Sequence, residues 1–123
     1  MSELFDRRDA APRAMILPLD GSAHADVAGA EWQPCGADGF LVKPLLEDGD
    51  SGLRTWLMKV EAGAWSPAHA HDEVEQIYVL DGSFYDDEQT YGPGEYIVRA
   101  AGAMHTAGSE TGATVLLFYS PAP

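Results

Sequence analysis

The stretch "GAWSPAHAHDEVEQIYVLDG", Gly63–Gly82, carries the two features that decide how this chain folds and what it can bind. Two histidines lie one residue apart, and an acidic run and an alternating apolar segment that ends in Asp-Gly follow them. Alternation is typical of a β-strand, where side chains point to opposite faces in turn. On one extended strand His69 and His71 therefore point the same way, and Glu75 shares their face. Imidazole and carboxylate suit divalent first-row metals, so these three residues are candidate ligands.

The rest of the chain contains similar short apolar runs, separated by segments rich in Gly, Pro and Asp. Such regular spacing of strands and turns is typical of an all-β sandwich or barrel, and no segment indicates a helix. Run 113–119 has apolar residues at both odd and even positions, which predicts burial on both faces, either between stacked sheets or in an oligomer interface. We expect strands in 39–46, 53–60, 75–80, 83–85, 95–99 and 113–119, with breaks that include 61–67 and 100–104.

A single strand cannot surround a metal ion, so a further ligand must come from another strand. His105 follows a glycine turn after the predicted strand 95–99, which is where a neighbouring strand could supply an imidazole. His24 lies in a turn-rich stretch, and we expect it to be solvent-exposed. Cys35 is the only cysteine, so no internal disulfide can form, and with no His nearby in sequence we expect a surface or packing thiol.

Length and charge limit the classes of function. A chain of 123 residues is long enough for one domain. We expect an N-terminal arm or edge strand in 1–31 and one domain in 32–123; within the arm, Pro18 confines the apolar piece "AMILPL" to a sheet edge. Seven Lys and Arg against twenty Asp and Glu give a net charge of −13, which argues against nucleic-acid and anionic-membrane partners. No apolar run has the length of a signal peptide core or membrane span, so we expect a cytoplasmic protein.

The histidine-rich stretch resembles the first motif of the cupin superfamily, with all five specified positions filled. The second cupin motif is matched at Gly94, Gly102 and His105, whereas Ala100 replaces its Pro and Ser109 its Asn. These departures affect the scaffold, since Ala lacks the fixed φ of Pro and Ser makes a weaker side-chain turn bond than Asn. The two motifs span residues 63–109, and the first motif is filled by Gly63, His69, His71, Glu75 and Gly82.

Residues 79–112, "VLDGSFYDDEQTYGPGEYIVRAAGAMHTAGSETG", look like the ChrR-type group of cupins. That resemblance implies a double-stranded β-helix, a jelly-roll β-barrel, with a mononuclear metal site formed by three histidines and one glutamate. The group includes the cupin half of an anti-sigma factor and small dioxygenases that cleave carbon–carbon bonds in diketone-like or hydroxyketone substrates. An anti-sigma role is disfavoured, because residues 1–60 offer only Cys35 and His24 for its zinc-binding half.

The resemblance implies one divalent metal ion per chain, with His69, His71, Glu75 and His105 as ligands. Fe(II) is favoured, although these ligand types also accept Mn, Ni, Co or Zn, and related dioxygenases work with three histidines alone. Glu75 is also a candidate proton acceptor during catalysis. For the pocket walls we single out Trp56, Tyr96 and Met104, because substrate pockets are mostly apolar and aromatic.

Three functions remain open at this point. The first is a metal-dependent dioxygenase that acts on a small oxygenated molecule. The second is a metal-dependent isomerase or lyase for a sugar-like substrate, which is disfavoured because the chain contains no Asn and few other polar pocket residues. The third is a non-enzymatic sensor of a metal or small ligand that signals to a partner. We expect a homodimer in which "AMILPL" adds a strand across the interface.

Overall fold

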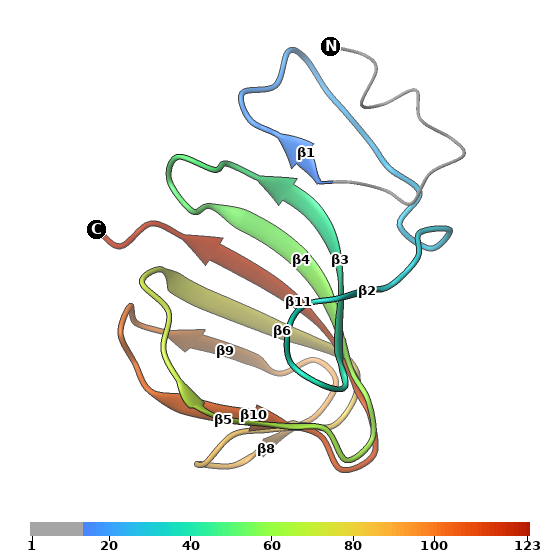
Figure 1. Ribbon diagram of the computed structural model, residues 1–123, viewed down its shortest axis with the longest axis vertical. Coiled ribbons are helices and arrows are strands. Elements are labelled where there is room, and N and C mark those ends of the chain that lie inside the picture. Colours follow the sequence, from blue (N-terminus) through green and yellow to red (C-terminus); the bar gives the residue numbers. More distant parts are fainter. Residues whose placement is uncertain (1–13) are drawn as a thin grey trace.

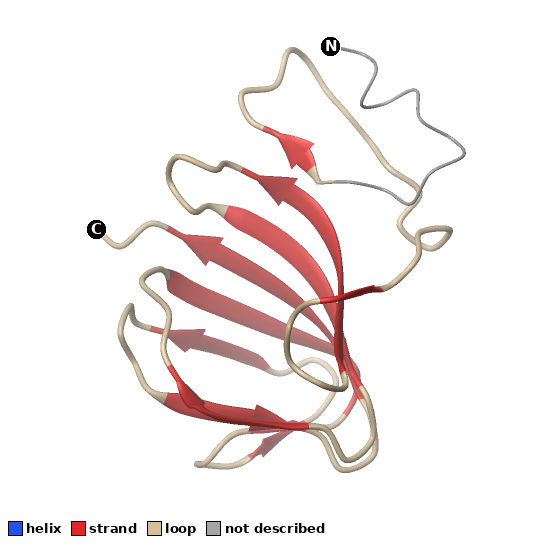
Figure 2. Ribbon diagram, viewed as in Figure 1, coloured by secondary structure: helices blue, strands red, loops and turns tan. Residues whose placement is uncertain are grey.

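The structure is a computed structural model that describes residues 14–123, and strands and loops make up all of this part (Figures 1 and 2). All six apolar strands predicted from the sequence are present, so the all-β prediction is confirmed. The part of the chain that is described contains no helix long and apolar enough to cross a membrane. The strands are β1 Met15–Ile16, β2 Gln33–Pro34, β3 Phe40–Glu47, β4 Arg54–Val60, β5 Trp65–His69, β6 Val74–Gly82, β7 Phe84–Tyr85, β8 Thr90–Tyr91, β9 Tyr96–Arg99, β10 His105–Gly108 and β11 Ala113–Ser120.

The strands form two sheets that face each other (Figure 1). The larger sheet has seven strands in the order β1-β3-β4-β11-β6-β9, with β2 also paired to β3. The smaller sheet has four strands in the order β5-β10-β7-β8. Consecutive strands often lie in different sheets, so loops such as 70–73 carry the chain from one sheet to the other.

The core lies between the sheets and follows the two-residue period of the strands. On β11 the odd-numbered residues Val115, Leu117 and Tyr119 are buried, and on β6 Ile77 and Val79 are buried. Phe84 of β7 comes from the smaller sheet and is also buried. The inner faces of the two sheets thus share one apolar core, which encloses the space in which a site can form.

Two strand residues explain local departures from regular pairing. Pro44 lies in β3 next to a shift in register against β4, which is where a strand tolerates a residue without an N–H group. Gly82 ends β6 with a φ of 76°, and a Cβ there would collide with the carbonyl oxygen of Gly112. Glycine is therefore required at position 82 both for its φ and for the close approach of the two chain segments.

The N-terminal segment lies along the open edge of the larger sheet. Met15 and Ile16 pair in parallel with Leu46 and Glu47 of β3, in the same chain (Figure 1). The expected edge strand therefore exists and pairs within its own chain, and its addition to a second subunit stays a prediction. Residues 1–13 of the predicted arm lie outside the described residues, and the boundary between 31 and 32 stays a prediction.

Candidate metal centre

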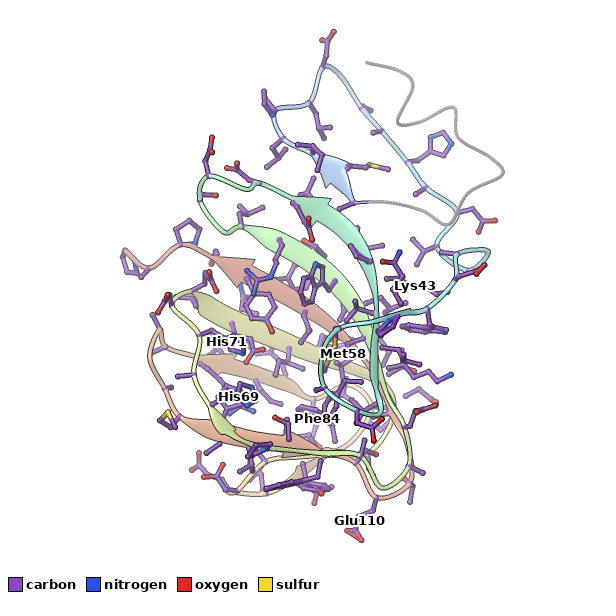
Figure 3. All side chains as sticks on the ribbon, viewed as in Figure 1. Lys43, Met58, His69, His71, Phe84 and Glu110 are labelled. Atoms are coloured by element: carbon purple, nitrogen blue, oxygen red, sulfur yellow. The ribbon has the colours of Figure 1, made fainter. Side chains whose placement is uncertain are left out.

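Three histidines converge in the space between the sheets. His69, His71 and His105 each offer a ring nitrogen, and these three atoms lie within 4.8 Å of one another. His69 ends β5 and His105 begins β10, where the two residues are direct partners in the antiparallel register. Figure 3 shows His69 and His71 next to each other near Met58 and Phe84. The prediction that His105 reaches the pair from a neighbouring strand is confirmed.

His69, His71 and Glu75 are brought together in a different way from the one predicted from the sequence. His69, His71 and Glu75 do not share one extended strand, because the chain leaves β5 after His69 and enters β6 of the other sheet at Val74. His71 lies in the connecting loop, where its carbonyl oxygen accepts a hydrogen bond from the N–H of Gly102 at 2.7 Å. The turn, and not strand parity, therefore brings these residues together.

Hydrogen bonds fix which ring nitrogen two of the histidines present. Nδ1 of His69 lies 2.9 Å from the carbonyl oxygen of Pro67 and 3.1 Å from Oγ of Ser66. Nδ1 of His105 lies 3.1 Å from the carbonyl oxygen of Ala103. A proton on Nδ1 satisfies these carbonyl groups and leaves the Nε2 lone pair free, which is the arrangement found for metal-ligating histidines.

Glu75 extends from β6 toward the same point. Its Oε1 lies 3.5 Å from Nε2 of His105, and its Oε2 lies 3.8 Å from Nε2 of His71. Oε2 accepts a hydrogen bond from the Tyr119 hydroxyl at 2.6 Å, whereas Oε1 is buried and has no hydrogen-bond partner. Glu75 is 4% exposed. It lies beside His71 and His105, but its carboxylate is not within 4.8 Å of all three histidine nitrogens.

A second buried carboxylate lies behind Glu75. Nε of Arg99 lies 3.3 Å from Oε1 of Glu75, without the alignment of a hydrogen bond, and Nη2 of Arg99 lies 3.0 Å from Oδ2 of Asp86. Asp86 also accepts hydrogen bonds from the Tyr91 hydroxyl and from the N–H groups of Glu88 and Gln89. Arg99 is thus a buried cation between two carboxylates, each of which has further donors.

The surroundings shift the pKa of several of these groups. Burial lowers the pKa of the His71 and His105 imidazoles, and for His105 the positive charge of Arg99 adds to the effect. Burial, with the adjacent Glu75 charge, raises the pKa of the Tyr119 hydroxyl. Burial alone would raise the pKa of Asp86, but its hydrogen bonds outweigh that effect and lower it.

The pKa of Tyr91 is raised to about 12 by burial and by its hydrogen bond to Asp86. The two tyrosines beside the buried carboxylates therefore stay protonated at neutral pH, so each can donate its hydroxyl hydrogen to a carboxylate. The two histidines with lowered pKa values are neutral at neutral pH, as metal ligation requires.

The histidines and Glu75 line a cavity of about 420 Å³ between the sheets. Its walls are mostly apolar, and Trp56, one of the three residues predicted to contact a substrate, is among them. Tyr96 and Met104 do not line it; they are 54% and 64% exposed. The other lining residues are Cys35, Gly36, Ala37, Phe40, Met58, Ser66, Ile77, Phe84, Ala107, Leu117 and Tyr119.

The remaining residues singled out from the sequence lie in the loops and turns. His24 is exposed, as predicted, and is not part of the histidine cluster. Cys35 is exposed beside the cavity and its thiol donates a hydrogen bond to the carbonyl oxygen of Phe40. Ser109 is fully buried, where its hydroxyl donates to the carbonyl oxygen of Ser83 and accepts from the N–H of Gly112. The side-chain turn bond expected of this residue is therefore present.

Sequence reasoning missed Tyr119, Arg99 and Asp86, all of which contact or support Glu75. Tyr119 and Arg99 lie in predicted strands, but only the pairing of these strands with β6 brings them opposite Glu75. The one available signal was a single Arg at an alternate position in an otherwise apolar strand, since a buried cation requires a buried partner.

The residues that are present fit a divalent metal ion. Three imidazole rings converge, and in two of them Nδ1 already forms a hydrogen bond to a backbone carbonyl oxygen. A buried carboxylate oxygen without a hydrogen-bond partner lies next to these rings. This oxygen has the charge of Arg99 nearby but accepts no hydrogen bond, and a metal cation among these side chains would bind it directly. Nitrogen ligands with a carboxylate are the set preferred by first-row divalent ions.

Comparison with known families identifies the chain. The model of the ChrR cupin-like domain matches residues 20–123. The chain belongs to the ChrR cupin-like family. The match begins inside segment 1–31, which we assigned to an arm. Comparison with curated protein sequences gives no match.

Solved structures agree on the fold. An RmlC-like cupin from Shewanella frigidimarina is 23% identical, with a TM-score of 0.70, and the alignment covers 82% of this chain and 93% of that one. The polyketide cyclase RemF from Streptomyces resistomycificus is 22% identical, with a TM-score of 0.68 and coverages of 80% and 79%. The predicted cupin jelly-roll fold is thereby confirmed, although its sheets do not close into a barrel.

The anti-sigma factor ChrR of Rhodobacter sphaeroides, solved in complex with SigE, is 22% identical, with a TM-score of 0.66. The alignment covers 77% of this chain but only 52% of that one, so the chain spans about half of the ChrR structure. A cyclase and an anti-sigma factor thus share this fold, and the function must be argued from the site.

Proposed function

We propose that this cupin binds one divalent metal ion through His69, His71, Glu75 and His105 and acts as an enzyme on a small oxygenated organic molecule, most simply as a dioxygenase. The observation that carries the proposal is the convergence of three imidazoles and a buried carboxylate oxygen without a hydrogen-bond partner on one mostly apolar cavity. Fe(II) is our favoured ion because of the resemblance to ChrR-type dioxygenases; the ligand set also accepts Mn, Ni, Co or Zn. A bound Fe(II) ion supplies redox chemistry and open coordination positions.

The residues of the chain select and orient the substrate. The cavity walls favour an apolar body and exclude water, and the histidine cluster marks the end where oxygen atoms of a diketone or hydroxyketone would bind. Trp56 is part of the wall and fixes the position of its indole by donating a hydrogen bond from Nε1 to Glu47 at 2.9 Å. A sugar would find few polar partners on these walls, which supports the dioxygenase over the sugar isomerase or lyase.

The first experiment is elemental metal analysis of protein purified without oxygen. We expect about one iron per chain in the wild type, loss of the metal in His69→Ala, and retention in His24→Ala, the control that removes an exposed histidine outside the site. Oxygen uptake with small diketones and hydroxyketones then tests the dioxygenase. Stoichiometric zinc or nickel without oxygen uptake would contradict the dioxygenase and favour a lyase, isomerase or sensor, and a wild type without metal would contradict the metal site.

Glu75 has a second proposed role as the proton acceptor from a carbon next to a substrate carbonyl. Glu75 lines the same cavity as the histidines, which supports this proposal. Glu75→Gln keeps the shape and the hydrogen-bond acceptor but not the negative charge or the basicity. We expect turnover to fall by at least a hundredfold, measured as oxygen uptake per bound metal ion. Full turnover with full metal occupancy would contradict this role.

A further inference from the structure

We infer that Tyr119, Arg99 and Asp86 are positioning residues of the metal centre, which hold the carboxylate of Glu75 so that Oε1 faces the histidines. The inference rests on the proposed metal site, since it says how the chain fixes the fourth ligand. These three side chains are not ligand candidates by spacing in the sequence, and they come from three different parts of the fold.

Strand register places two of them directly beside Glu75. In the larger sheet β6 lies between β11 and β9, and Glu75 pairs with Tyr119 on one side and with Arg99 on the other. Directly opposed residues of neighbouring strands point to the same face, so all three side chains project into the space between the sheets. Glu75 thus has a hydrogen-bond donor, Tyr119, on one side and a cation, Arg99, on the other.

Tyr119 determines which oxygen of Glu75 remains available. Its hydroxyl donates to Oε2 at 2.6 Å, and Oε1 accepts no hydrogen bond. Oε1 lies between Nε of Arg99 at 3.3 Å and Nε2 of His105 at 3.5 Å. The ring of Tyr119 is itself fixed, because Trp56 packs edge-on against it and the guanidinium of Arg54 lies 4.0 Å from its centre. A tyrosine held on two sides gives Glu75 a fixed orientation.

Arg99 and Asp86 connect the two sheets at the metal centre. His69 and His105 belong to the smaller sheet, whereas Glu75 and Arg99 belong to the larger one. Asp86 directly follows β7 of the smaller sheet, and its 3.0 Å ion pair with Arg99 crosses between them. Arg99 and Asp86 are 9% and 7% exposed, so water screens this pair weakly. The pair therefore limits the separation between Glu75 and the histidines of the facing sheet.

The test measures metal affinity and not activity. Co²⁺ is titrated into metal-free protein, and its visible absorption reports both binding and coordination geometry. For Tyr119→Phe, which removes only the hydroxyl, we expect a 10- to 100-fold weaker Co²⁺ affinity and an altered spectrum. Arg99→Lys keeps the charge but removes the planar guanidinium that contacts both carboxylates, and we expect it to weaken the Co²⁺ affinity as well.

Tyr78→Phe is the matched control, because Tyr78 lies on the same strand as Glu75 but is exposed on the opposite face. It should keep the wild-type affinity and spectrum. The inference would be overturned if Glu75→Gln weakened Co²⁺ binding while Tyr119→Phe and Arg99→Lys both kept the wild-type affinity and spectrum. That outcome would leave the proposed metal site intact. An unchanged affinity in Glu75→Gln would also overturn the inference, and failure of the wild type to bind Co²⁺ would remove the proposed function itself.

Discussion

The candidate metal centre consists of individual residues whose surroundings suppress protonation. His71 and His105 are both partly or fully withdrawn from water, and their pKa values are lowered chiefly by that burial. A carboxylate next to them acts in the opposite direction but does not outweigh the burial. The imidazoles are thus kept in the neutral form that binds metal, and this has a cost that can be measured in the metal-free protein.

We predict that the metal-free protein loses stability as the pH falls below about 6.5. Unfolded histidines take up protons near pH 6.5, whereas His71 and His105 in the folded chain do so only at lower pH. Between these values the unfolded state binds more protons, so the free energy of unfolding decreases by up to about 1.4 kcal/mol per pH unit for each histidine. Urea denaturation at several pH values between 7.5 and 5 measures this slope.

The slope should decrease in His71→Gln and in His105→Gln, because each variant removes one of the titrating groups. His24→Gln should keep the wild-type slope, since His24 is exposed and lies outside the cluster. Equal slopes in the wild type and in both site variants would show that burial of these imidazoles does not couple to folding.

At the scale of the element, apolar periodicity predicted the six apolar strands but not the two that carry His69 and His105. Strand β5 reads "WSPAH" and begins inside a segment predicted as a break, because its inward side chains belong to Ser66 and His69 and give no apolar alternation. Strand β10 has only four residues, and it was expected from the position of His105 and not from apolar periodicity. Functional strands bury polar side chains around a site, so the pattern that identifies core strands is missing there.

The candidate ligands were predictable from the sequence, whereas their geometry was not. Motif spacing identified His69, His71, Glu75 and His105, but the argument that one strand aligns the first three was wrong, since the chain changes sheets between His71 and Glu75. The role of Tyr119 and Arg99 depends on which strands become neighbours, which is set by long-range pairing. Local patterns carry no information on that pairing.

We predict that Gly82→Ala destabilises the turn between β6 and β7 much more than Gly63→Ala destabilises its own turn. Both glycines have positive φ, 76° and 85°, so alanine costs about 1 to 2 kcal/mol at either position. At Gly82 the new methyl group would also meet the backbone of Gly112 and Ala113, whereas at Gly63 it would meet open space. Urea denaturation should therefore show that the free energy of unfolding falls by more than about 2 kcal/mol for Gly82→Ala only. Equal decreases in the two variants would contradict the steric argument.

The whole molecule has an uneven surface. The net charge of −13 makes most encounters between two copies repulsive, yet the outer face of the larger sheet exposes apolar side chains on β6, β9 and β11. On that outer face Tyr78 of β6 pairs with Tyr96 of β9, and further exposed apolar side chains surround them. The path of paired strands ends at β9, so this face reaches the edge of the sheet. The outer-face patch consists of Tyr78, Leu80, Tyr96, Val98 and Phe118.

We propose that this patch is the contact between two copies of the chain in a homodimer. A second copy fits because it presents the same uncharged surface, so the acidic remainder of each molecule can stay in solvent. Sedimentation equilibrium should give the mass of a dimer for the wild type and of a monomer for Val98→Glu, since each copy would then bury a charge in an apolar contact. Trp65→Glu is the matched control: Trp65 is an equally exposed apolar residue on β5 of the other sheet, and its variant should stay dimeric. A monomeric wild type, or a Val98→Glu variant that remains a dimer, would show that this face has another role.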